Sequence, residues 1–190
     1  MRLFLIAVTS AILATPASAT VTFSLPPLVL RALPGEISGW GFVIANDTNY
    51  IEITSAQYCV NPVSFPACTP PTLGTFTDFI SGFNDIIVGP TGGTLPSSVA
   101  QAFHLPAHQG VGSFAFNPSA PVFASDDGKI VLTYNVFDAD PNSGAANLLF
   151  TGLTVSANTM IFVDAPEPSK TLSAMLGLVL LISLRISSPK

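Results

Sequence analysis

The chain has 190 residues, of which 48% are hydrophobic and 9% are charged, and its net charge at pH 7 is −5. Residues 20–165 are more acidic than the whole chain, because they hold ten acidic and two basic residues, a net charge of −8. Binding to nucleic acid requires clustered Lys and Arg side chains at the phosphates, so this composition argues against a nucleic-acid partner. An acidic segment with few charges is typical of an exported protein that faces solvent, or of one that binds cations.

The first 19 residues have the pattern of a secretory signal peptide. Arg2 precedes an apolar stretch at residues 3–13, and Ala17-Ser18-Ala19 fits the small-x-small rule for cleavage. A retained membrane anchor is the alternative, but the apolar stretch is shorter than the roughly 20 residues of a spanning helix. We therefore expect cleavage after Ala19 and export of the remaining chain.

Residues 20–165 are long enough for one domain and show no sustained helical periodicity. Short alternating runs are broken by Gly, Pro, Asn and Asp, a pattern that predicts strands and tight turns. The candidate strands cover residues 20–25, 39–44, 51–54, 73–80, 110–116, 129–137, 148–156 and 159–164. About eight short strands in a domain of this size predict an all-β fold, an antiparallel β-sandwich.

The alternation also predicts which side chains are buried. Trp40 alternates with glycines at apolar positions, so we expect it in the core. The runs at residues 39–44 and 51–54 flank the turn residues 46–49 and are expected to form a hairpin. In the longest run, the residues expected to face the core are Ile130, Leu132, Tyr134 and Val136.

Two cysteines, Cys59 and Cys68, flank a Pro-containing segment in a chain that is expected to be exported. We predict a disulfide between them, because exported proteins fold in an oxidising compartment. A catalytic thiol would need a nearby base, and metal binding would need more ligands.

The Gly-, Pro- and Ser-rich residues 91–106 are expected to form a long loop, with one helical turn around residues 97–103. His104 and His108 would share a face of a helix and hold a metal there, but Pro106 between them argues against a regular helix. Two surface histidines in a loop are therefore the favoured interpretation.

Two acidic turns are candidates for cation binding. Asp126-Asp127-Gly128 is expected to form a tight turn before the strand at residues 129–137. Asp138, Asp140 and Asn142 alternate in a loop that ends at Gly144, and alternating oxygen ligands suit Ca²⁺. The spacing departs from that of an EF-hand loop, and the same residue types are the usual formers of a hairpin loop, so a plain loop is the favoured interpretation.

The end of the chain has the pattern of a sorting and anchoring signal. Pro166-Glu167-Pro168 predicts a stiff hinge, residues 172–184 predict a short apolar helix, and Arg185 adds a positive charge. Even residues 171–186 would span only about 24 Å as a helix, against roughly 30 Å of bilayer hydrocarbon. Such a segment enters a membrane only where the bilayer thins or where long basic side chains reach its surface. A buried or amphipathic C-terminal helix is the alternative, but this run is apolar on nearly every face.

On these residues the tail resembles the PEP-CTERM sorting signal of Gram-negative bacteria. The matching residues are Pro166, Glu167, Pro168, Leu176, Gly177, Leu178 and Arg185. Family tails usually end in a cluster of arginines, whereas Arg185 is followed here by residues 186–190 with one lysine. The resemblance implies processing by an exosortase, a membrane-embedded protease-transpeptidase. It also implies a brief stay in the inner membrane, then display at the cell surface or release into a matrix associated with exopolysaccharide.

A second, shorter resemblance concerns residues 34–36, 39–42 and 46–48, which are similar to the opening strands of immunoglobulin-like ectodomains that accompany such tails. We therefore expect a signal peptide (1–19), a sandwich ectodomain (20–165) and a sorting tail (166–190). The expected function is that of a non-enzymatic surface or matrix protein without a cofactor. The alternative is a carbohydrate- or Ca²⁺-dependent binding module. A secreted hydrolase is disfavoured, because the chain has two histidines and lacks a Gly-x-Ser-x-Gly elbow.

Overall fold

The computed structural model describes residues 20–64, 67–82 and 86–167. The predicted signal peptide, Pro168, the apolar run at residues 172–184 and Arg185 lie outside the described residues. Among the residues described, no helix has the length and apolar composition needed to cross a membrane.

The described chain is all-β, as predicted. Two short 3₁₀ turns, η1 (Leu105–Ala107) and η2 (Pro141–Ser143), interrupt a succession of strands. The strands in chain order are β1 (Val21–Ser24), β2 (Val29–Ala32), β3 (Ile37–Trp40), β4 (Phe42–Asn46), β5 (Tyr50–Ser64), β6 (Ala67–Thr69), β7 (Gly74–Asp78), β8 (Ile86–Val88), β9 (Ser98–Gln101), β10 (Gly112–Phe116), β11 (Ser125–Phe137) and β12 (Leu148–Val163).

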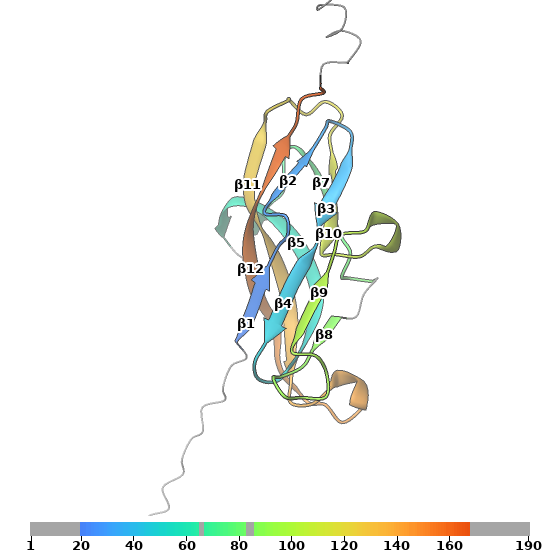
Figure 1. Cartoon of the computed structure of the whole chain (residues 1–190). Coiled ribbons are helices and arrows are strands. Elements are labelled where there is room, and N and C mark those ends of the chain that lie inside the picture. Colours follow the sequence, from blue (N-terminus) through green and yellow to red (C-terminus); the bar gives the residue numbers. More distant parts are fainter. Residues whose placement is uncertain (1–19, 65–66, 83–85, 168–190) are drawn as a thin grey trace, which may run out of the picture.

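The strands form a sandwich-like arrangement of two layers (Figure 1). One layer is the sheet β2-β12-β11-β5-β6, with β8 also paired to β5, and the other consists of the sheets β1-β4-β9 and β3-β10-β7. The pairing is antiparallel except between β2 and β12, which are parallel. β3 and β4 are separated by Gly41, where an added Cβ would lie 2.7 Å from the Gln101 carbonyl oxygen. A glycine there permits the close approach that joins the two small sheets.

Aromatic side chains fill the core between the layers. Trp40 is fully buried, as predicted, and its ring stacks on that of Tyr58 with centroids 5.8 Å apart. Phe114 meets Trp40 edge-on at 6.4 Å. β11 faces this core with every second residue, which confirms the predicted burial of Ile130, Leu132, Tyr134 and Val136.

The predicted hairpin between residues 39–44 and 51–54 is wrong. β4 pairs with β1 and β9, whereas β5 pairs with β11 in the opposite layer. Both strands bury their alternate apolar residues in the same core cluster, so they face each other across the core instead of lying side by side. Alternation identifies a buried face, but it does not say in which sheet that face lies.

The predicted tight turn at Asp126-Asp127-Gly128 is also wrong, because these residues lie inside β11. The Asp126 carboxylate accepts hydrogen bonds from the backbone N–H groups of Thr72 and Leu73, at 3.0 and 3.3 Å. Gly128 is needed for close packing, since an added Cβ would lie 2.7 Å from the Tyr58 hydroxyl oxygen. Residue types that usually form turns therefore have other roles within this strand. Asp126 binds the backbone of the neighbouring segment, and Gly128 makes room for the Tyr58 ring.

Two further boundaries differ from prediction. The two strands expected at residues 148–156 and 159–164 are one strand, β12. Residues Ser98–Gln101 form strand β9 instead of a helical turn, because β9 pairs with the edge of β4. The turn of helix in this region is η1, which begins just after His104.

Candidate functional site

A groove of about 720 Å³ lies at the end of the domain where the chain continues beyond β12. Its lining residues come from β2 and the turn after it, from the segment before β11, and from the residues after β12. Among them are Arg31, Glu36, Phe123, Asp164 and Glu167, the last of which belongs to the predicted sorting signal. This groove, the exit groove, is the candidate functional site.

Hydrogen bonds on both edges hold the end of β12 in the sheet. The Asp164 N–H donates to the Ala32 carbonyl at 2.9 Å, which extends the parallel pairing with β2 by one residue. On the other side, the Phe123 N–H donates to the Val163 carbonyl at 2.7 Å, and the Val163 N–H donates to the Ala124 carbonyl at 2.9 Å. The ordered sheet therefore reaches to within two residues of Pro166.

One ion pair and one aromatic contact order the polar side of the groove. The Arg31 Nη1 lies 3.1 Å from the Asp164 Oδ1, and its guanidinium lies 4.4 Å from the centre of the Phe162 ring. Both members of the ion pair are more than one third exposed, so the pair contributes at most about 1 kcal/mol. Its main effect is to fix the direction of the guanidinium over the ring.

Phe123 supplies an apolar surface beside these charges. Its side chain is 67% exposed, and its φ of 65° is in the left-handed region that bulky residues rarely adopt. The ring centre lies 6.5 Å from that of Phe162. Glu36, across the groove, accepts a hydrogen bond from the Leu33 N–H at 2.9 Å and so stabilises the turn after β2. An exposed aromatic ring beside charged groups suits contact with an extended peptide.

Of the predicted sorting residues, Pro166 and Glu167 lie in the described chain, and both are exposed. Only Asp164 and Ala165 separate them from the end of β12. Pro168 and Arg185 are outside the described residues. The first two residues of the predicted sorting signal are therefore exposed at the end of the domain where the exit groove lies.

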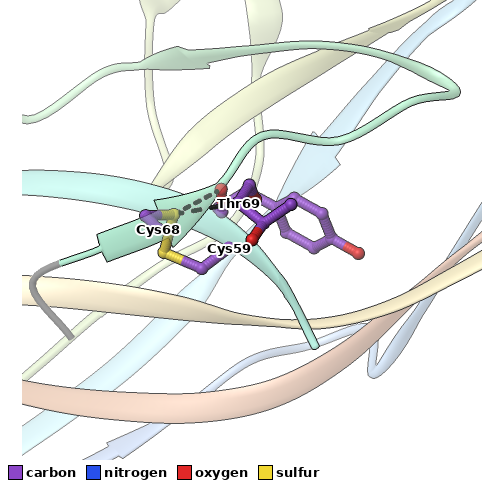
Figure 2. The surroundings of a disulfide bond; sticks show 4 residues. Cys59, Cys68 and Thr69 are labelled. Carbon is purple, nitrogen blue, oxygen red and sulfur yellow. Dashed lines mark hydrogen bonds between the residues drawn. A yellow bond between two sulfur atoms is a disulfide. The ribbon is translucent and has the colours of Figure 1, made fainter. Parts of the chain in front are cut away.

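The predicted disulfide between Cys59 and Cys68 is confirmed, with an S–S distance of 2.05 Å (Figure 2). It joins β5 to β6 within one sheet and does not connect the two layers. The Cys68 sulfur lies 3.4 Å from the carbonyl oxygen of Tyr58, whose ring belongs to the aromatic core. The bond thus ties the short edge strand to a well-packed part of β5.

The candidate calcium residues lie in the loop between β11 and β12, which confirms the predicted hairpin loop. The Asp138 carboxylate accepts hydrogen bonds from the backbone and side-chain N–H groups of Asn147 at 2.7 and 2.8 Å, and these bonds lower the pKa of Asp138. Asp140 accepts one from the backbone N–H of Asn142 at 2.9 Å. These bonds close the loop on itself. In the part of the chain that the structure describes, no three His, Cys, Asp or Glu residues gather as metal ligands.

The two predicted surface histidines flank the 3₁₀ turn η1. His104 is exposed, and its backbone pairs with that of Gln109. His108 ends the turn with a φ of 49°, and its ring meets the Phe79 ring edge-on at 5.1 Å. The two residues therefore shape a loop and do not share a helical face.

The exit-groove residues Arg31, Glu36 and Phe123 were not recognised in the sequence as site residues. Only Arg31 has a feature in the sequence that could have marked it as a site residue, because it is one of two basic residues in the acidic segment 20–165. Phe123 lies in an irregular segment, so no periodicity indicates where its side chain points. Their grouping depends on the pairing of β2 with β12 over more than a hundred residues of sequence.

No family model and no curated protein matches this chain. Among solved structures, it is similar to AvmM, a protein described as catalysing macrocyclization in alchivemycin A biosynthesis. The two share 13% sequence identity with a TM-score of 0.25, over 80% of this chain and 92% of the other. A similarity this low carries no conclusion about fold or activity.

Proposed function

We propose that this chain is a non-enzymatic exported protein, whose all-β domain is displayed at the cell surface or released into the extracellular matrix. Sorting would occur through the PEP-CTERM-like segment that begins at Pro166, with an exosortase-like enzyme as partner. One observation carries the proposal: Pro166 and Glu167 are exposed and are separated by only two residues from a strand whose end is hydrogen-bonded on both edges. A recognition motif presented in this way is accessible to a protease without unfolding of the domain.

The arrangement of the two chain ends supports the same proposal. β1 begins at one end of the long axis of the sandwich, and β12 finishes at the other (Figure 1). A domain attached through its C-terminal end would therefore project away from the membrane. In this proposal residues 1–19 are removed on export, and residues 172–184 form the short apolar helix that holds the chain in the inner membrane.

We further propose that the domain is immunoglobulin-like. β1 pairs antiparallel in one layer, and the chain then crosses to the other layer, where β2 pairs parallel with β12. A buried tryptophan packed between the layers is also a feature of immunoglobulin domains. The disulfide differs, since it lies within one sheet, whereas antibody domains have it between the sheets.

The experiment is intact-mass spectrometry of the protein recovered from the surface and the medium of the native cell. We expect a chain that lacks residues 1–19 and everything after roughly Pro168. A chain that keeps residues 169–190 in the membrane would contradict the sorting proposal and make the tail a permanent anchor.

Two matched substitutions connect this result to the exposed motif. Glu167→Gln removes the charge of the motif, and we expect the unprocessed form to accumulate in the membrane fraction. Glu52→Gln makes the same chemical change on β5, away from the exit groove, and should leave processing unchanged. Equal processing of both variants would show that the enzyme does not read Glu167.

A further inference from the structure

A hollow at the opposite end of the domain surrounds the start of β1. Its volume is about 290 Å³, and its lining includes Thr20, Thr22, Asn46, Asp47, Thr91 and Ser98. The Thr20 backbone nitrogen lies 2.9 Å from the Asp47 Oδ1, to which it donates a hydrogen bond. Thr20 is also the residue that follows the predicted cleavage position, Ala19.

We propose that this hollow is a binding site for the α-ammonium group that removal of residues 1–19 creates on Thr20. The inference rests on the export part of the proposed function. Hydrolysis of the Ala19–Thr20 bond consumes one water molecule and leaves a carboxylate on Ala19 and an amino group on Thr20. The amino group is protonated at neutral pH, because the ordinary pKa of an α-amine is about 7.7–8.0.

The backbone already holds the nitrogen in place. Val21, the next residue, is paired with Asn46, so the following position, Asp47, lies opposite Thr20 across the two strands. Cleavage therefore replaces the N–H of an amide by an ammonium at an atom that is already bonded to a carboxylate. A hydrogen bond between two charged groups is stronger than the one that it replaces.

An ammonium at Thr20 can donate more hydrogen bonds than the amide that it replaces. The Thr20 amide has one N–H, whereas the ammonium has three. Asn46 is 4% exposed, and its side-chain oxygen has no hydrogen-bond partner in the described part of the chain. The hydrogen bond from Thr20 also lowers the pKa of Asp47, so the carboxylate is ionised at neutral pH. The hollow thus presents the Asp47 carboxylate to the new terminus, and the partnerless oxygen of Asn46 belongs to a residue that lines the same hollow.

Among the described residues that line the hollow, only Asp47 carries a charge. The other residues that line the hollow are uncharged, and the strands β1, β4, β9 and β12 around it contain no ionisable side chain. The expected interaction is therefore one isolated pair. β1 is an edge strand of four residues that begins at Val21, so pairing at the preceding residue, Thr20, opposes fraying of the new terminus.

The test compares the mature chain, residues 20–190, with a chain that carries Ala19 in front of Thr20. In the longer chain the ammonium is displaced by one residue, up to about 3.6 Å, and Thr20 keeps its amide. Each chain is prepared with Asp47 and with Asp47→Asn. The measurement is the rate at which the terminal amine reacts with an amine-directed reagent near pH 7, followed by mass spectrometry of the N-terminal peptide.

In the mature chain with Asp47 we expect the amine to react about three to ten times more slowly than in its Asp47→Asn variant, because the carboxylate favours the protonated, unreactive amine. The substitution should have little effect in the longer chain. Asp127→Asn, the same chemical change on β11, serves as the control and should leave the rate unchanged in both chains.

The pH dependence of thermal stability supplies a second readout. Pairing raises the pKa of the ammonium in the folded state above its unfolded value. The added stability is then complete below the unfolded pKa and is lost as the pH rises through the folded one. The mature chain should therefore lose stability relative to the longer chain between about pH 7 and pH 10.

Two results overturn the inference, and they can be told apart. Equal amine reactivity in the mature chain with Asp47 and with Asp47→Asn would show that the pair does not form. If the protein from the native cell begins at a residue other than Thr20, the ammonium is never created there. That second result would contradict the export part of the proposed function, whatever the reaction rates.

Discussion

The two halves of β12 differ sharply in their surroundings. In the half nearer the C-terminus, Thr159, Ile161 and Val163 are buried, with exposed fractions of 6%, 0% and 0%. In the other half, Leu148 is 53% exposed and Leu153 is 37% exposed. Both halves belong to one strand of sixteen residues without a charged side chain.

The difference arises from the strand's neighbours. β11 pairs with β12 from Leu148 to Phe162, but β2 pairs only with residues Met160 to Val163. The register with β11 also shifts in the exposed half, where Asn135 accepts hydrogen bonds from the Thr151 hydroxyl and the Gly152 N–H. Burial of the side chains in this strand therefore depends on which strands pair with it and which residues cover it. The hydrophobicity of the side chains alone does not predict their burial.

The largest expected effect tests the buried half directly. Ile161→Ala removes a fully buried side chain and should lower the free energy of unfolding by about 2–5 kcal/mol. Leu153→Ala, in the exposed half, should cost less than about 1 kcal/mol. Chemical denaturation of both variants measures these values, and equal losses would contradict the comparison.

A buried hydrogen-bond relay gives the next effect. The Thr159 hydroxyl accepts from the Trp40 indole N–H at 2.9 Å and donates to the Leu28 carbonyl at 2.8 Å. Thr159→Val keeps the shape but leaves the buried Trp40 indole N–H without an acceptor, at an expected cost of about 1–3 kcal/mol. The Leu28 carbonyl loses one of two bonds, since it still accepts from the Met160 N–H at 3.0 Å.

The chain has a single tryptophan, so its fluorescence during urea unfolding reports on this relay. Thr154→Val, at an exposed position of the same strand, is the control and should change the midpoint little. A similar shift in both variants would mean that the hydroxyl of Thr159 is unimportant.

A substitution at a glycine tests how rigidly the exposed half of β12 holds its backbone conformation. Gly152 has a φ of +69°, and an added Cβ would meet no atom within 4 Å. Gly152→Ala should therefore cost about 1–2 kcal/mol through its conformation alone, without a steric clash. Thermal unfolding measures the loss, and an unchanged midpoint would show that this half rearranges freely.

The smallest effect concerns the ion pair at the end of β12. Asp164→Asn removes the partner of Arg31, a surface pair that contributes at most about 1 kcal/mol. The loss should shrink as salt is added, because exposed charges are screened. Thermal unfolding at low and high salt checks this, and a large loss independent of salt would assign Asp164 a role other than pairing.

Several features were predictable from sequence because they depend on local pattern. Alternation of period two along β11 predicts an extended strand with one buried face, and Ile130 and Leu132 are buried accordingly. Cys59 has Cys68 as its only candidate partner within the chain, so pairing follows once the chain is taken to be exported. In the same way, the exposed Pro166 and Glu167 are recognisable by their order in the chain.

The tertiary structure decided which strands are neighbours, because pairing brings together residues that are far apart in sequence. β4 and β5 have the pattern of a hairpin, yet each pairs with more distant strands. Asp126 looks like a turn residue until Thr72 and Leu73 are placed beside it. The exit groove and the contact between Thr20 and Asp47 arise in the same way. Alternation determines that a residue is buried or exposed in a strand, whereas the balance of packing over the whole sandwich determines what it touches.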